Sequence, residues 1–258
     1  MNKLNRQIKI IEELKENGMI NIKHLHEKLK VSKVTIRSDI EELEQKGYLI
    51  KTRGGAVVSN NRNLVRLVEK TIHEYEHEKD MIARTAAKLV KPGMRIIIDS
   101  GSTTSFLLRY LKDMNLTVIT NSLIAVHELS GLQNINLIVS GGSLRHESQS
   151  LIGIPSLGFF TTINADILFL GATGFSLTKG ASASNIMEAE TKKMMISSSE
   201  DVYLLIDSSK FGINSLSKIC DASDLTGIIT NQISHKLMNQ CKSHDILVLQ
   251  SLPETYHE

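Results

Sequence analysis

Residues 31–44 read VSKVTIRSDIEELE, and this stretch decides the fold of the first part of the chain. Ile36, Ile40 and Leu43 recur at the i, i+4 and i+7 spacing of a single helix face. Ser32 stands just before this run, where its hydroxyl can accept from the first free N–H groups of a helix. The stretch therefore predicts a helix that begins after Ser32 and buries one apolar stripe.

The residues on either side extend this pattern into a small domain. A helix is predicted over residues 22–29, preceded by a longer helix that ends at Gly18. After the quoted stretch, residues 48–51 read as a strand and residues 53–56 as a turn into its partner strand. Three short helices followed by a hairpin predict a winged helix-turn-helix domain over residues 1–57.

In a helix-turn-helix, the second helix lies in the major groove of DNA with its polar face toward the bases. Arg37 suits guanine, Lys33 suits a phosphate, and Thr35 suits a thymine methyl or a phosphate. The side chains expected to reach DNA are Ser32, Lys33, Thr35, Arg37, Ser38, Lys51 and Arg53. A protein-interaction module with the same helices and hairpin remains an alternative on pattern alone.

The distribution of charge favours DNA more than the net charge does. The 258 residues carry a formal charge of only +2, with 41% hydrophobic and 22% charged residues. Residues 1–55 hold twelve Lys or Arg against eight Asp or Glu, a net +4, so the remainder carries −2. A basic unit attached to a slightly acidic body indicates an anionic partner for the basic unit.

The same N-terminal stretch resembles the DNA-binding module of DeoR-family bacterial transcription regulators. That module follows the pattern V-S-x-x-T-I-R-R-D-L-x-x-L-E, then a glycine, then a wing that ends in G-G-A; here the glycine is Gly47 and the wing ends at Ala56. The chain departs from the pattern at Ser38, where the family has a second arginine. The resemblance implies operator binding, with a base preference altered at that position.

From residue 94 onward the pattern changes to short β-branched runs that alternate with helical stretches such as 104–111 and 186–197. This alternation predicts an α/β fold with a mostly parallel sheet covered by helices, over residues 75–253, joined by a linker over 58–74. The predicted strands are 95–98, 117–119, 136–139, 167–170, 202–206, 227–229 and 245–249.

The first of these strands ends in a candidate anion site, residues 99–104, which read DSGSTT. Backbone N–H groups at a helix N-terminus, with hydroxyls beside them, bind phosphate well. The absence of a G-K-[ST] sequence argues against nucleotide hydrolysis, and a plain strand-to-helix connection is the alternative. Polar residues also follow neighbouring strands, and in open α/β sheets ligands bind at that edge.

These segments resemble the DeoR-family sensor domain, whose fold is related to ribose-5-phosphate isomerase and which binds phosphorylated sugars. The resemblance implies a phosphate loop of Asp99, Gly101, Ser102, Thr103 and Thr104, with Asn121 beside it and Lys210 opposite. Residues 141–150 resemble the amino-sugar branch, regulators of N-acetylgalactosamine-type catabolism. In that branch the residues expected to contact the sugar are Gly142, Arg145, Gln149 and Ser150.

Other classes of function are less well supported. Residues 73–77 satisfy H-E-x-x-H, but their flanks are charged where a zinc helix needs an apolar face, so no metal is expected. The two cysteines have no metal or disulfide spacing and fit a reducing cytoplasm. A sugar-phosphate isomerase with a DNA-binding appendage is the alternative, although Asp99, Asp166, Glu188 and Asp207 form no catalytic signature.

The sequence therefore predicts a cytoplasmic transcription regulator, a repressor of a sugar or amino-sugar operon, with no cofactor and no catalytic residues. Its expected partners are double-stranded operator DNA, a phosphorylated sugar effector and further copies of the same chain. Two-fold pairing in a dimer or tetramer would match a palindromic operator.

Overall fold

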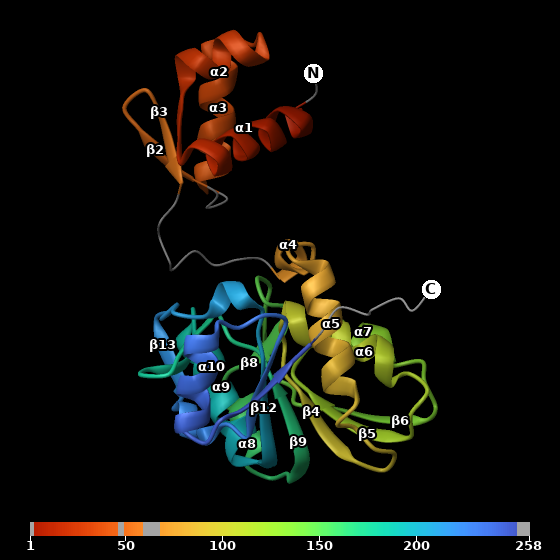
Figure 1. Cartoon of the computed structure of the whole chain (residues 1–258). Helices are drawn as coiled ribbons and strands as arrows, with labels where there is room; N and C mark the ends of the chain where they lie inside the picture. Colours follow the sequence, from red (N-terminus) through yellow and green to blue (C-terminus); the bar gives the residue numbers. More distant parts are fainter. Residues whose placement is uncertain (1–2, 46–48, 59–67, 252–258) are drawn as a thin grey trace, which may run out of the picture. The chain divides into compact units, whose positions relative to one another are not determined.

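The structure, a computed structural model, describes residues 3–45, 49–58 and 68–251. The chain divides into two compact units, residues 1–65 and 66–258, each with its own core (Figure 1). Gly47, Tyr48 and residues 59–67 of the predicted linker lie outside the described residues. The rest of the predicted linker includes a short helix, α4, Val68–Ile72.

The first unit is a winged helix-turn-helix. Its elements are α1 Lys3–Asn17, β1 Met19–Asn21, α2 Ile22–Leu29, α3 Lys33–Gln45, β2 Leu49–Thr52 and β3 Gly55–Val58. The strands form an antiparallel sheet in the order β1-β3-β2. The three predicted helices and the wing hairpin are confirmed, and β1 is an element that the sequence pattern did not predict.

The predicted stripe of α3 forms the centre of this unit. Ile36 and Ile40 are fully buried and Leu43 is 1% exposed, packed with Leu14 of α1 and Leu25 of α2. Burying a side chain of this size contributes about 1.5–3 kcal/mol, so the stripe fixes α3 against the other two helices. The same packing directs the opposite face of α3 to solvent.

The second glycine of the wing, Gly55, is required for steric reasons. A side chain at this position would place its Cβ 1.9 Å from the carbonyl oxygen of Ile20, because β3 pairs with β1 there. Only glycine allows the two backbones to approach in this way. The G-G-A sequence thus fixes how the wing joins the helices.

The second unit is built on a seven-stranded parallel sheet in the order β15-β14-β12-β9-β4-β5-β6. Its strands are β4 Arg95–Ile98, β5 Leu116–Thr120, β6 Ile135–Val139, β9 Ala165–Leu170, β12 Ser199–Leu205, β14 Gly227–Thr230 and β15 Leu247–Gln250. Each of the seven predicted runs overlaps one of these strands, so the α/β fold class is confirmed.

Helices cover both faces of the sheet. They are α5 Glu76–Ala87, α6 Ser102–Leu111, α7 Leu123–Leu129, α8 Ile154–Phe160, α9 Ile186–Ser197 and α10 His235–Ser243. Side chains of α5, α6 and α7 share a core with Ile96 and Ile98 of β4, whereas those of α8, α9 and α10 share one with Ile97. Successive residues of a strand point to opposite faces, so one short strand supports both layers.

Two smaller sheets extend the unit, and neither was predicted from sequence. One is the antiparallel hairpin of β7 Ser143–Arg145 and β8 Ser150–Ile152. The other contains β10 Gly174–Ser176, β11 Gly180–Ala183 and β13 Ser217–Cys220. Two short 3-10 helices complete the elements, η1 Ser208–Lys210 and η2 Ala222–Asp224. Within the described ranges, none of the helices has the length and apolar character to span a membrane.

Candidate nucleic-acid interface and ligand site

The outer face of α3 carries the predicted DNA-contacting side chains. Lys33, Arg37 and Ser38 are exposed, and Ser32 lies immediately before the helix. The Oγ of Ser32 accepts from the backbone N–H of Thr35 at 3.1 Å and lies 2.9 Å from the Thr35 hydroxyl. The first turn of α3 is thereby capped, which leaves Lys33 and Arg37 as its exposed cationic side chains.

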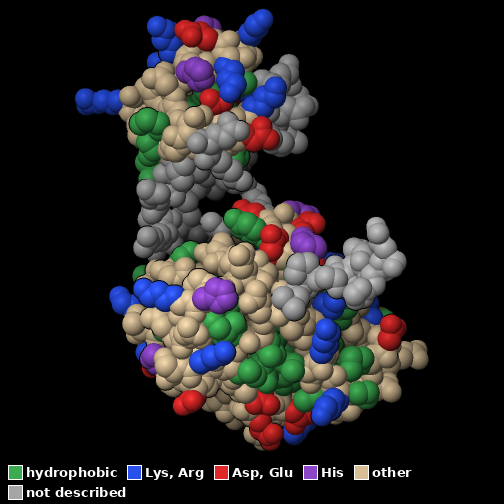
Figure 2. All heavy atoms as spheres, viewed as in Figure 1, with side chains coloured by type: hydrophobic (Ala, Val, Ile, Leu, Met, Phe, Trp, Pro, Cys, Tyr) green, Lys and Arg blue, Asp and Glu red, His purple; other side chains and the backbone are tan. Residues whose placement is uncertain are grey.

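The wing carries the other two predicted residues, and their environments differ. Lys51 lies on β2 and pairs its ammonium group with the carboxylate of Glu41 on α3, which holds the pKa of Glu41 below its usual value. Arg53 is exposed in the turn between β2 and β3. Figure 2 shows lysine and arginine side chains projecting from this unit. The structure therefore keeps Arg53 available, whereas Lys51 would exchange Glu41 for a phosphate.

An ion pair inside the unit holds α3 to α1. The guanidinium of Arg6 binds both carboxylate oxygens of Asp39, with Nη2 donating to Oδ1 at 3.0 Å and Nε donating to Oδ2. Asp39 is 1% exposed and the Arg6 side chain 10%. Hydrogen bonding to Asp39 raises the pKa of Arg6 further. The aspartate of the T-I-R-S-D sequence is thus a structural residue that sets the position of α3.

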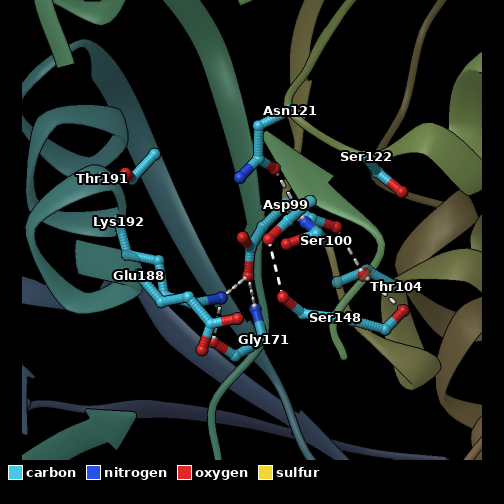
Figure 3. Close-up of polar contacts among 12 residues, drawn as sticks. Asp99, Ser100, Thr104, Asn121, Ser122, Ser148, Gly171, Glu188, Thr191 and Lys192 are labelled. Atoms are coloured by element: carbon cyan, nitrogen blue, oxygen red, sulfur yellow. Dashed lines mark hydrogen bonds and ion pairs between the residues drawn. The ribbon is translucent and has the colours of Figure 1, made fainter. Parts of the chain in front are cut away.

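In the second unit, the ends of three adjacent strands meet as the sequence predicted. Asp99 follows β4, Asn121 follows β5 and Gly171 follows β9, and β4 lies between the other two strands in the sheet. Figure 3 shows these residues together, with Lys192 and Glu188 reaching them from α9. The candidate ligand site is therefore centred on Asp99.

The carboxylate of Asp99 is enclosed and only partly bonded. Its Oδ2 accepts from the Gly171 N–H at 2.9 Å and from the Lys192 ammonium group (Figure 3). Its Oδ1 is buried and has no hydrogen-bond partner among the described residues. Burial raises the pKa of Asp99, because desolvation outweighs the opposing effect of Lys192 and Gly171. A buried acceptor without a partner is costly, and a ligand hydroxyl would satisfy it.

Lys192 and Glu188 are site residues that the sequence pattern did not assign. They lie one turn apart on α9, with side chains 8% and 11% exposed. Lys192 also donates to the Gly171 carbonyl at 3.2 Å. The signal was present, because Glu188, Lys192 and Met195 form a helical stripe that is buried on α9. Charged residues on such a stripe point to a buried pair or a site.

The predicted phosphate loop leads directly into α6. Thr104 is fully buried, and its hydroxyl donates to the carbonyl oxygens of Asp99 at 2.6 Å and Gly101 at 3.0 Å. Ser102 and Thr103 occupy the first turn of α6. The hydroxyl of Thr104 thus holds the loop closed, and the N–H groups of the first turn remain the means by which this loop would bind an anion.

Asn121 connects the loop to the β7–β8 hairpin. Its Oδ1 accepts from the Ser100 N–H at 3.1 Å, and its Nδ2 donates to the Leu151 carbonyl at 3.3 Å. Ser150 is fully buried on the same hairpin, with its hydroxyl 2.7 Å from that of Ser148. Asn121 and Ser150 are therefore fixed by hydrogen bonds within the protein, Asn121 next to the loop that follows β4 and Ser150 on the adjoining hairpin, and their contact with an effector stays a prediction.

The other hairpin residues have distinct structural roles. Gly142 adopts φ +119° and its backbone lies so close to Ile152 that a Cβ would be 2.5 Å from the carbonyl oxygen. Arg145 binds Glu188 at 3.1 Å and Glu147 at 3.2 Å, with its side chain 12% exposed. Gln149 has φ +50° and donates to the His146 carbonyl at 3.3 Å. Of these residues, Arg145 is joined to the Asp99 site through α9.

Lys210 ends η1 after β12, two strands from β4 in the sheet. The cation that contacts Asp99 is Lys192, so a role for Lys210 opposite the phosphate loop stays a prediction.

The H-E-x-x-H sequence does not lie on one helix. α4 ends at Ile72, and Tyr75 adopts φ +56° before α5 begins. Among the residues that the structure describes (3–45, 49–58 and 68–251), no three His, Cys, Asp or Glu side chains form a cluster suited to a metal ion.

Comparisons with known proteins agree with both units. Residues 6–62 match the family model of the DeoR-like helix-turn-helix domain, and residues 74–232 match that of the DeoR C-terminal sensor domain. The transcriptional regulator IolR of Bacillus subtilis (strain 168) is 33% identical, covering 95% of this chain and 98% of its own length. The transcriptional repressor GlcR of the same organism is 28% identical, covering 90% and 89%.

Among solved structures, ribose 5-phosphate isomerase A from Methanocaldococcus jannaschii is similar in part, with 22% identity and a TM-score of 0.40. The match covers 53% of this chain and 54% of the isomerase, and a likeness of this size carries no functional argument.

The relatives found by sequence are named as transcriptional regulators, so the prediction of a regulator rather than an enzyme is confirmed. The chain belongs to the DeoR family of DNA-binding transcriptional regulators.

Proposed function

We propose that this regulator represses a sugar or amino-sugar operon and that a phosphorylated sugar bound at the Asp99 site alters its affinity for the operator. The proposed domains are residues 1–57 for DNA and 75–253 for the effector. The observation that carries the proposal is the buried Oδ1 of Asp99, an acceptor without a partner in the described part of the chain. Repression is favoured by the likeness to a relative named as a repressor.

The chemistry of the site suits a ligand with both hydroxyl and phosphate groups. A sugar hydroxyl would donate to Asp99 Oδ1, and the phosphate would accept from N–H groups at the start of α6. Lys192 reduces the electrostatic cost of bringing a dianion near Asp99, since its ammonium group already neutralises that carboxylate. On this proposal Ser102, Thr103 and Lys210 contact the phosphate, and Gly142, Arg145, Gln149 and Ser150 shape the pocket for the sugar ring.

The proposed DNA contacts are the exposed residues of α3 and the wing. Arg37 reads a base, Lys33 and Arg53 bind phosphates, and Lys51 leaves Glu41 to bind a third phosphate. Ser32, Thr35 and Ser38 complete the surface. We also propose that the protein acts in the cytoplasm as a homo-oligomer, because two copies related by a two-fold axis would place two α3 helices on a palindromic operator.

The experiment is a panel of sugar phosphates tested by thermal shift and then by fluorescence anisotropy on an operator duplex selected with the full-length protein. The panel contains hexose, hexosamine and N-acetylhexosamine 6-phosphates, together with the corresponding free sugars and inorganic phosphate. An effector should raise the unfolding temperature and change operator affinity. Failure of every sugar phosphate to change operator affinity would remove the sensing half of the proposal.

Matched lysine variants locate the effector. Lys192→Ala should abolish the thermal shift, whereas Lys193→Ala, next to it in sequence but 39% exposed and paired with Glu190, should preserve it. Equal effects of the two variants would place the ligand elsewhere. Light scattering of the same samples, with and without the selected duplex, tests the oligomer.

A further inference from the structure

One apolar side chain on α3 has no place in the core. Val34 lies between Lys33 and Thr35 in the first turn of α3, and 72% of its surface is exposed. A β-branched residue lowers helix propensity slightly, and burying its apolar surface against a partner would be favourable. A side chain of this kind at a surface that binds DNA therefore invites a search for an apolar partner on the DNA.

The helix phase places Val34 on the face opposite the core. Residues two positions apart differ by about 200° around an α-helix. Val34 is two positions before the fully buried Ile36, and Ser38 is two positions after it and two before Ile40. Val34 and Ser38, one turn apart, therefore form the outermost stripe of α3, and the exposed cations Lys33 and Arg37 both lie along one side of it.

The edges of base pairs offer one apolar group in the major groove, the C5-methyl group of thymine. The charges beside Val34 are complementary to DNA phosphates, which argues for DNA rather than for a protein as the occupant of this stripe. Thr35 is less suited to the same contact, because its hydroxyl lies 2.9 Å from that of Ser32 and its side chain is held next to this capping residue.

We propose that Val34 contacts the methyl group of a thymine in each operator half-site and is a specificity-determining residue of α3. The proposal rests on the role of α3 as the groove-binding helix and adds a base preference to it. Lys33 and Arg37 supply charge and hydrogen bonds, whereas Val34 distinguishes thymine from the other bases by apolar contact.

The test uses a duplex selected from a random library by the full-length protein, with each thymine replaced in turn by deoxyuridine. This replacement removes the methyl group and retains all hydrogen-bonding groups. Wild-type protein should lose about fourfold in affinity at one position per half-site, as expected for one methyl-sized contact. Val34→Ala should bind thymine and uracil equally at that position.

Three variants serve as controls. Val34→Ile should retain the sensitivity to uracil, and so should Thr35→Ser, which removes a methyl group but keeps the hydroxyl near Ser32. Met19→Ala alters an apolar residue that is 65% exposed on β1 and should also retain the sensitivity to uracil.

Salt dependence separates the apolar contact from the charged ones. Val34→Ala should leave the salt dependence of binding unchanged, since an apolar contact releases no counterions. Lys33→Ala should reduce the slope of log affinity against log salt concentration by about one.

Two results would overturn the proposal. One is a uracil effect that persists in Val34→Ala and disappears in Thr35→Ser, which would give the methyl contact to Thr35. The other is a Val34→Ala protein whose operator affinity and uracil profile are both unchanged. This result would overturn the proposal even if the oligomeric state of the variant had changed. Loss of binding in Arg37→Ala alongside either result would show that α3 still reads DNA, and intact binding in Arg37→Ala would reject the groove-binding role itself.

Discussion

The Nε of Arg145 donates to the Oε1 of Glu188 at 3.1 Å, and this contact ties the β7–β8 hairpin to α9. From Arg145 the contacts continue to Glu147, whose backbone carbonyl accepts from the N–H of Val68 at 2.6 Å. Val68 is the first residue of α4. On the other side, Glu188 lies one helical turn before Lys192, which binds Asp99. These contacts, together with the turn of α9 between Glu188 and Lys192, connect the ligand site to α4.

Arg145→Gln should weaken the effect of an effector on operator binding more than it weakens effector binding itself. The variant removes the charge that links Glu188 to Glu147, and coupling between two sites requires an element whose arrangement both sites bias. The measurement is operator affinity with and without saturating effector. Lys112→Gln, which disrupts the exposed pair with Glu128, is the control. A full effector response in Arg145→Gln would exclude this route.

Asp99→Asn should change how stability depends on pH. The raised pKa of Asp99 means that the folded state binds a proton more tightly than the unfolded chain. Between the ordinary pKa near 3.8 and the raised pKa of the folded state, the contribution of Asp99 to stability should therefore fall as pH increases. The expected fall is about 1.4 kcal/mol for each step of one in pH across that window.

Asparagine cannot titrate, so the difference between wild type and Asp99→Asn should decline with rising pH and then become constant. Urea unfolding at a series of pH values above 4 measures the difference. A difference that grows with pH would mean that Lys192 lowers the pKa of Asp99 below its ordinary value.

Asp39→Ala should destabilise the N-terminal unit by about 3–5 kcal/mol, because it leaves the guanidinium of Arg6 buried without a counter-ion. The pair of Lys3 and Glu42 also joins α1 to α3 but is largely exposed, so Lys3→Ala should cost at most about 1 kcal/mol. Denaturant unfolding of the full chain, followed by operator binding, compares the two variants. Similar losses in both would contradict a structural role for Asp39.

Ser38→Arg should shift the preferred operator. Ser38 lies on the outermost stripe of α3, where an arginine would reach base edges or a phosphate that serine does not. Selection of duplexes by both proteins from the same random library is the measurement, and a change at one position per half-site is expected. Identical selected sequences would show that position 38 is merely exposed.

Arg37→Ala should cost about 1–3 kcal/mol on the selected operator if Arg37 reads a base. The loss should be much smaller on a duplex in which the base pair it reads has been changed. A uniform loss on every duplex, together with a salt slope reduced by about one, would instead assign Arg37 to a phosphate.

Much of the fold follows from local patterns. The stripe of Ile36, Ile40 and Leu43 predicted α3, and β-branched runs predicted all seven strands of the parallel sheet, because each pattern reflects which side of one element is buried. β1 escaped prediction since it is three residues long and its partner β3 lies more than thirty residues away. The β7–β8 hairpin was missed because polar residues dominate its turn.

The sequence by itself determined the family, the order of the two units and the set of strand ends at which Asp99 and Asn121 stand. Motif residues and periodicity are local, so one chain suffices to recognise them. Only the tertiary structure decided that Lys192 contacts Asp99, that Lys51 pairs with Glu41, and that Val34 faces outward beside Ser38. The physical reason is that charge pairs and exposure depend on how separate elements pack, and neighbouring residues do not specify that packing.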